Sequence, residues 1–146
     1  MKVVLDASII IKWLLADPAR EEHTELATDL IGEVVNGRID AVQPLHWQIE
    51  VIAVMARVGA DRAERDAGLL QALDLEVTGS LEVMRRACRL SIGLNHHLFD
   101  TLYHAVALET AEAVLVTADQ DYLSKARHLG RIIGLKEWPA VLGMNS

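Results

Sequence analysis

The chain has 146 residues, 51% of them hydrophobic, which predicts one domain (residues 1–146) with its own core. Its net charge of −7 excludes a generic duplex-coating protein, because such a protein carries a basic stripe. The only cysteine, Cys88, excludes disulfides and thiolate zinc sites. No apolar stretch approaches the length that spans a bilayer, so we expect a cytoplasmic protein without a membrane partner.

The chain begins with a predicted strand followed by two predicted helices. Lys2–Leu5 is β-branched and lacks polar alternation, as a buried strand does. Ser8–Ala16 predicts a helix that ends before Asp17-Pro18, because the residue preceding proline avoids helical angles. Glu21–Asn36 is amphipathic, and Gly37 is its expected C-cap.

The middle of the chain predicts two further strands and three helices. Asp40–Gln43 is a short strand, and Pro44 suits the first turn of a helix that runs to about Val58. Asp61 and Ser80 are the expected N-caps of the next two helices. The remaining elements here are a helix, a brief strand and a helix, over Arg62–Leu73, Glu76–Val77 and Leu81–Leu94.

The last third of the chain continues the alternation. Phe99–Thr110 predicts a helix and Ala113–Val116 a strand, after which Asp121–Leu129 is helical up to Gly130 and Arg131–Ile133 is a final strand. Strands that alternate with helices predict an α/β fold with three layers, in which a parallel sheet is covered by helices on both faces.

Four carboxylates stand apart from the apolar pattern. Asp6, Glu50 and Asp100 are each the only formal charge in a long apolar stretch, and Asp119 follows the apolar run AVLVTA. An unpaired buried ion costs several kcal/mol. No Lys or Arg lies at a matching depth in these stretches, so we expect the four acids to share a cation.

The predicted topology brings the same four acids together. Asp6 and Asp119 follow the carboxyl ends of strands, where open α/β sheets bind ligands, while Glu50 and Asp100 lie on helices. Carboxylate oxygens without His or Cys partners favour Mg²⁺ or Mn²⁺. Singly, Asp6, Asp100 and Asp119 (or Asp121) are equally well explained as helix N-caps. Capping gives Glu50 no role.

Several motifs together resemble the PIN domain, and most closely the VapC-type toxin ribonucleases of toxin–antitoxin pairs. The resemblance covers nearly the whole chain and is specific as a set, although each motif alone is weak. The motifs are VVLDASIIIKWLL near the N-terminus, P-x(5)-E at Pro44–Glu50, FDTLYHAVAL at 99–108 and LVTADQDYL at 115–123.

The resemblance implies a sheet of about five parallel strands and a Mg²⁺- or Mn²⁺-dependent endoribonuclease. It implies that metal is held by the four acids already singled out, which are Asp6, Glu50, Asp100 and Asp119. Ser8 fills the hydroxyl position of the D-x-S motif, where it would hydrogen-bond a ligand. Thr117 of the T-A-D motif and Asp121 are two further candidates to support the ligands.

The resemblance also implies partners, namely an RNA substrate and a VapB-like antitoxin. The helices after Glu21 and Pro44 carry broad apolar faces, which suggest a homodimer and a groove for a partner peptide. The alternative is a noncatalytic PIN-like module for RNA binding, but such a module loses acids and this chain keeps all four. A receiver domain and a haloacid-type phosphatase are disfavoured, because Asp6 has no acidic neighbour and D-x-S replaces D-x-D.

Some remaining polar residues have two interpretations. Lys12 would face substrate phosphates or pack its stem and leave its amine in solvent. His104 lies one turn after Asp100 and is a candidate hydrogen-bond partner for that carboxylate. Six arginines would guide RNA from a basic rim or would simply be exposed helix charges, and these are Arg57, Arg62, Arg65, Arg85, Arg86 and Arg89.

Overall fold

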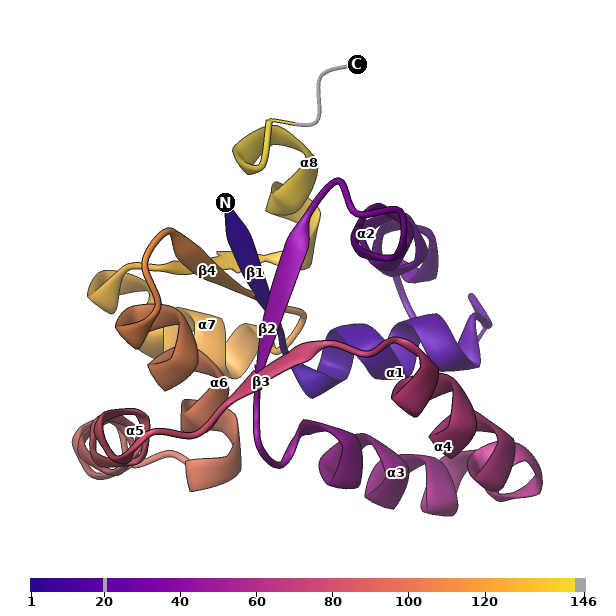
Figure 1. Ribbon diagram of the computed structural model, residues 1–146, viewed down its shortest axis with the longest axis horizontal. Coiled ribbons are helices and arrows are strands. Elements are labelled where there is room, and N and C mark those ends of the chain that lie inside the picture. Colours follow the sequence, from indigo (N-terminus) through magenta and orange to yellow (C-terminus); the bar gives the residue numbers. More distant parts are fainter. Residues whose placement is uncertain (20, 144–146) are drawn as a thin grey trace.

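The computed structural model describes residues 1–19 and 21–143 and places one parallel sheet at their centre (Figure 1). The five strands described have the spatial order β3-β2-β1-β4-β5, so β1 lies in the middle. This confirms the expected α/β fold with a parallel sheet. The strands are β1 Lys2–Leu5, β2 Asp40–Pro44, β3 Glu76–Thr78, β4 Ala113–Thr117 and β5 Ile132–Gly134.

Eight α-helices flank the sheet within the part of the chain that the structure describes. Helix α6 contacts β1, β2 and β4 and is backed by α5, whereas α1 contacts β1 and β4 and is backed by α2, so the two pairs cover opposite faces (Figure 1). The helices are α1 Ala7–Leu15, α2 Thr24–Val35, α3 Trp47–Val58, α4 Ala63–Ala72, α5 Leu81–Leu94, α6 Leu98–Glu109, α7 Gln120–Ala126 and α8 Trp138–Val141.

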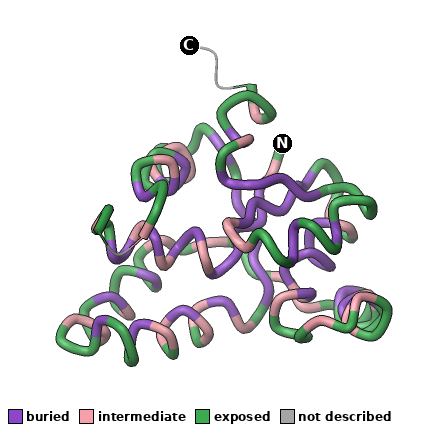
Figure 2. The backbone as a smooth tube through the Cα atoms, turned by 180° about the vertical axis from the view of Figure 1, so that it is seen from behind, coloured by how far each residue is buried: buried purple, intermediate pink, exposed green. Residues whose placement is uncertain are grey.

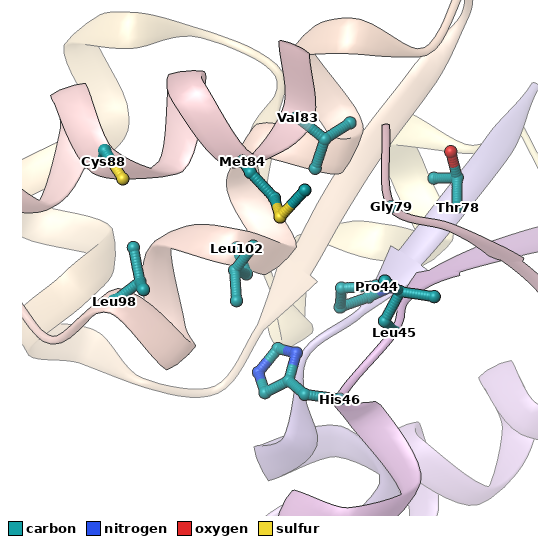
Figure 3. Close-up of a pocket in the computed structure, with 10 residues that line it drawn as sticks. All are labelled: Pro44, Leu45, His46, Thr78, Gly79, Val83, Met84, Cys88, Leu98 and Leu102. Carbon is teal, nitrogen blue, oxygen red and sulfur yellow. The ribbon is translucent and has the colours of Figure 1, made fainter. Parts of the chain in front are cut away.

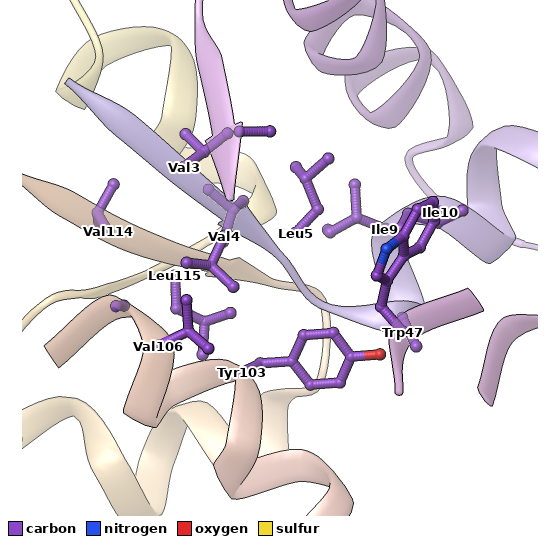
Figure 4. Close-up of a cluster of buried hydrophobic side chains, with 14 of the residues drawn as sticks. Val3, Val4, Leu5, Ile9, Ile10, Trp47, Tyr103, Val106, Val114 and Leu115 are labelled. Carbon is purple, nitrogen blue, oxygen red and sulfur yellow. The ribbon is translucent and has the colours of Figure 1, made fainter. Parts of the chain in front are cut away.

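The central strands are buried on both faces, as Figure 2 shows for the middle of the molecule. Successive side chains of a strand point to opposite faces, so β1 contributes to two halves of the core. Figure 4 shows Val4 beside Leu115 and Val106 of α6, and Leu5 on the side of Ile9 in α1. Because helices cover both faces of the sheet, nearly every side chain of β1 and β4 is apolar.

A buried glutamine extends the sheet next to the candidate site. The register between β1 and β2 pairs Lys2 with Asp40 and Val3 with Ala41. Farther along, the Gln43 side chain accepts a hydrogen bond from the Leu5 N–H at 2.7 Å and donates one to the Leu5 carbonyl at 2.9 Å. The amide side chain thus pairs with the backbone that leads directly into the first carboxylate.

Four predictions about element ends were wrong, the first of them the start of α2, which begins at Thr24 and not at Glu21. Pro44 ends β2, where it is paired with Thr78, and α3 begins only at Trp47. Asp61 lies inside the short 3₁₀ turn Ala60–Arg62, so α4 starts beyond its reach without a side-chain cap. The last strand begins at Ile132, because Arg131 has a φ of 57° and leaves the strand conformation.

Other predictions of capping were right. The Ser80 hydroxyl accepts from the Val83 N–H at 3.2 Å and caps α5. Gly37 follows the end of α2 with a φ of 75°, a conformation that glycine adopts without strain. Among residues 1–19 and 21–143, no helix has the length and apolar character needed to cross a membrane.

Candidate metal centre

The carboxyl ends of the neighbouring strands β1 and β4 each lead into one of the acids. The strands are neighbours in parallel register, with Leu5 opposite Val116, and Asp6 and Asp119 follow these positions. The strand order reverses about β1, since β2 and β4 leave on its two sides, and such a switch point opens a crevice for ligands. Asp6 is 8% exposed and lies at the bottom of this arrangement.

Two helices bring the other acids to the same place. Glu50 lies in the first turn of α3 and Asp100 in the first turn of α6. The negative charges of Asp100 and Glu50 both raise the pKa of Asp6, and those of Glu50 and Asp119 raise the pKa of Asp100. Asp100 is therefore electrostatically coupled to each of the other three carboxylates. These charge effects link Asp6, Glu50 and Asp119 to Asp100, but only Asp100, Asp119 and His96 present ligand atoms within 4.8 Å of one another among the described residues.

The cluster lacks a fixed cation. Burial is the main reason that the pKa of Asp6 rises to about 6, and the neighbouring carboxylates add to it. Burial also raises the pKa of Asp100, although the His96 hydrogen bond acts in the opposite direction. Within residues 1–19 and 21–143, the ion pairs of these acids involve only histidines, not Lys or Arg. The repulsion is what a divalent cation would relieve.

Each of the four carboxylates uses one oxygen for contacts with protein groups. Asp6 Oδ2 accepts from the Ser8 N–H and hydroxyl, and Asp119 Oδ1 accepts from the Tyr122 N–H. Asp100 contacts His96 through Oδ2, and Glu50 accepts from Tyr103 through Oε2. The second oxygen of each acid has no hydrogen bond from the described residues. This pattern fits ligands that neighbouring groups orient and that offer one free oxygen to a metal.

Two of the three predicted supporting residues contact the ligands. The Ser8 hydroxyl donates to Asp6 Oδ2 at 2.5 Å and accepts from the Ala118 N–H at 3.1 Å, so it ties the ends of β1 and β4 together. Thr117 Oγ1 accepts from the Asp119 N–H at 3.0 Å. Asp121 is different, because its side chain is 73% exposed and faces Lys125 at 3.7 Å.

The histidine beside Asp100 is not the one expected. His104 bonds the Tyr122 hydroxyl and the Gly130 carbonyl, each at 2.8 Å, so its predicted bond to Asp100 is wrong. Instead, His96 Nε2 lies 2.9 Å from Asp100 Oδ2. Lys125 donates to His96 Nδ1 at 3.2 Å, and so Nε2 carries the proton and donates to the carboxylate.

Neither histidine of the site was expected there from the sequence, in which a satisfied or surface role is the default for His96. His96, Asp100 and Asp119 present possible ligand atoms within 4.8 Å of one another. His46 Nε2 lies 2.7 Å from Glu50 Oε2. Each histidine precedes its acid by four residues, which is the only signal in the sequence, but both lie outside regular helix, where this spacing predicts no contact.

The candidate cationic residues are largely engaged elsewhere. Lys12 is buried and its amine lies 2.8 Å from a carboxylate oxygen of Glu21. The amine therefore neither extends into solvent nor stands free to contact substrate phosphates. Arg62 donates to the Leu14 carbonyl and lies beside the buried Asp66. Arg65, Arg85 and Arg86 pair with acids of their own or a neighbouring helix, namely Asp66, Glu82 and Glu109.

The donor set of the centre suits a hard cation. Carboxylate oxygens predominate, and the Asp100-facing nitrogen of His96 is already occupied by a hydrogen bond. Mg²⁺ and Mn²⁺ prefer such oxygen ligands and retain waters. The residues present therefore fit the metal that the sequence predicts.

Comparison with known proteins agrees with the geometry. The chain matches the family model of the PIN domain over residues 3–129, and this range contains all four acids. A comparison with curated proteins gave no match. Members of the matched family are generally nucleases that bind divalent metals. Since the match covers most of its length, the chain belongs to the PIN domain family.

Proposed function

We propose that this protein is an endoribonuclease that hydrolyses RNA phosphodiester bonds with Mg²⁺ or Mn²⁺. The observation that carries the proposal is the cluster of Asp6, Glu50, Asp100 and Asp119, which has no Lys or Arg counter-ion among the described residues. Residues 1–146 would form one domain. The proposed substrate occurs in the cytoplasm, and we propose that the protein acts there.

In this proposal the residues have distinct tasks. Asp6 and Asp100 hold the principal ion, and Glu50 and Asp119 complete its environment or position a second one. When bound, the metal lowers the pKa of a water and neutralises charge on the nonbridging phosphate oxygens. Ser8 keeps Asp6 oriented through its 2.5 Å hydrogen bond, and His96 does the same for Asp100 at 2.9 Å.

We further propose that the nuclease is the toxin of a type II toxin–antitoxin pair and acts as a homodimer. The motif set that resembles VapC supports the first part. An apolar pocket of about 220 Å³ supports the second, because Leu45 and Met84 line it and remain 67% and 45% exposed (Figure 3). Helix α3 leaves Ile49 exposed and α2 leaves Val35 exposed at its end, while other apolar side chains of α2, such as Leu30 and Ile31, are buried.

A VapB-like antitoxin would complete the pair. The cluster of four acids favours a basic side chain from such a partner, which would block the metal centre. Co-expression of this chain with the product of the adjacent upstream reading frame, followed by pull-down, tests this. Failure to form a complex with that product would remove the antitoxin from the proposal and leave the nuclease standing.

The nuclease activity is tested by cleavage of total RNA with mapped cut sites. Wild type should cleave with Mg²⁺ or Mn²⁺, whereas Asp6→Asn and Asp100→Asn should lose activity at least about 100-fold, because the ligand charge is removed without a change of shape. Asp29→Asn, at an exposed acid on α2, is the matched control. Full activity of either ligand variant, or in excess EDTA, would refute the proposal. Metal-independent RNA binding without cleavage would favour the noncatalytic module.

A further inference from the structure

His46 stands at the N-cap position of α3 but does not cap the helix. Its Nε2 instead donates to the main-chain carbonyl of Phe99 at 2.9 Å and lies 2.7 Å from Glu50 Oε2. A carbonyl oxygen only accepts, so Nε2 carries the proton. That N–H bonds the Phe99 carbonyl, and Glu50 Oε2 lies within ion-pair distance of the same nitrogen.

The Phe99 carbonyl anchors the imidazole to the segment that holds Asp100. This carbonyl belongs to the peptide bond between Phe99 and Asp100, at the start of α6. Helices α3 and α6 come from distant parts of the sequence, and each supplies one acid of the centre. The imidazole thus contacts the Glu50 side chain while it is bonded to the main chain beside Asp100.

Neighbouring rings hold the imidazole in place. Its centroid lies 5.1 Å from that of Phe99 and 4.9 Å from that of Tyr103, and the ring forms one edge of the apolar pocket beside Leu98 and Leu102 (Figure 3). The other nitrogen, Nδ1, is buried and has no hydrogen-bond partner among the described residues. A phenylalanine would fill this space without that cost of about 1–3 kcal/mol. A histidine at this position is therefore better explained by the contacts of its Nε2 atom with the Phe99 carbonyl and Glu50.

We propose that His46 is a positioning residue for Glu50 in the metal centre. His46 and the Tyr103 hydroxyl, which donates at 3.3 Å, both engage Oε2 and leave Oε1 to face the cation. Neither group would touch the metal or the RNA. The inference rests on the proposed function, since it assigns His46 to the same centre, but it concerns one oxygen of one ligand.

The test compares Mn²⁺ affinity by titration calorimetry in His46→Phe and His46→Gln. His46→Phe keeps an aromatic ring and removes the N–H, so binding should weaken about 10-fold or more, as for other groups that orient a metal ligand. His46→Gln places an amide N–H near the position of Nε2 and should restore affinity to within about 3-fold of wild type. The control is His128→Phe at an exposed histidine, which should bind Mn²⁺ as wild type does.

A double-mutant cycle with Glu50→Gln separates positioning from general damage. If His46 acts through Glu50, most of the effect of His46→Phe should vanish in the Glu50→Gln background. Wild-type affinity in His46→Phe would overturn the inference, and so would an undiminished loss in the Glu50→Gln background. In both cases, Mn²⁺ binding by wild type would leave the proposed function intact. Absence of Mn²⁺ binding by wild type would overturn both.

Discussion

Asp6 both caps α1 and belongs to the acid cluster. Its Oδ2 accepts from the Ser8 N–H and thereby caps the helix, while Oδ1 is left for a ligand. The two interpretations that the sequence allowed for this residue are therefore compatible, because a carboxylate has two oxygens. The same holds for Asp119, which caps α7 through Oδ1. Capping by these acids orients their side chains and does not argue against a metal site.

Ionised Asp6 should weaken the metal-free fold. Its pKa is raised from 3.8 to about 6, so the folded state loses stability relative to the unfolded chain as pH rises from about 4 to above 6. The full effect is about 3 kcal/mol. Asp6→Asn keeps an oxygen for the cap and carries no charge. In EDTA at pH 7.5, chemical denaturation should show the variant to be more stable than wild type, with the difference disappearing near pH 4.

Adding Mn²⁺ at pH 7.5 is the control for this prediction, because metal should stabilise wild type and not Asp6→Asn. If wild type in EDTA is more stable than Asp6→Asn at pH 7.5, burial and the neighbouring carboxylates do not destabilise the ionised Asp6 side chain.

At the scale of elements, the Gln43 side chain replaces backbone pairing between β2 and the end of β1 with two hydrogen bonds to Leu5. Gln43→Leu has a similar shape but leaves the Leu5 N–H and carbonyl without the two partners that Gln43 supplies. The free energy of unfolding should fall by about 2–4 kcal/mol, since each buried unpaired group costs about 1–3 kcal/mol. Urea denaturation measures this directly.

Gln71→Leu provides the matched control for that variant. The Gln71 side chain is exposed and donates to Gln48, so its replacement should change stability by less than about 0.5 kcal/mol. Equal stability of Gln43→Leu and wild type would show that the buried amide does not support the strand before Asp6.

The accuracy of sequence reasoning differed between elements for physical reasons. The strands and the four acids were found because apolar runs and isolated charges are local patterns. Pro44 was misplaced because proline suits both a helix start and the end of a strand. His96 and His46 were missed because their contacts depend on turns between elements, such as the one at Asn95, where φ is 50°. Tertiary geometry, not spacing, brings these rings to the acids.

At the scale of the whole molecule, the apolar surface beside α3 and α5 should mediate assembly. Leu45→Lys introduces a charge at a side chain that is 67% exposed, so the fold should persist. In the proposed homodimer this charge would be buried, and sedimentation velocity should show monomers for the variant and dimers for wild type. Lys introduced at the exposed Val141 is the control. Dimers of unchanged stability in Leu45→Lys would place the interface elsewhere.

The whole chain carries a net charge of −7, yet its proposed substrate is a polyanion. A metal held by the proposed centre would resolve this conflict locally, because it would place positive charge beside the acids. The proposed activity therefore depends on a cation at the carboxyl ends of β1 and β4 more than on any surface charge.

Anomalous diffraction from a crystal soaked in Mn²⁺ tests that claim most directly. We expect an anomalous peak within about 2.5 Å of carboxylate oxygens of Asp6 and Asp100, with Glu50 and Asp119 at its sides. A well-soaked crystal with no peak among these four residues, or with its Mn²⁺ bound elsewhere, would contradict it.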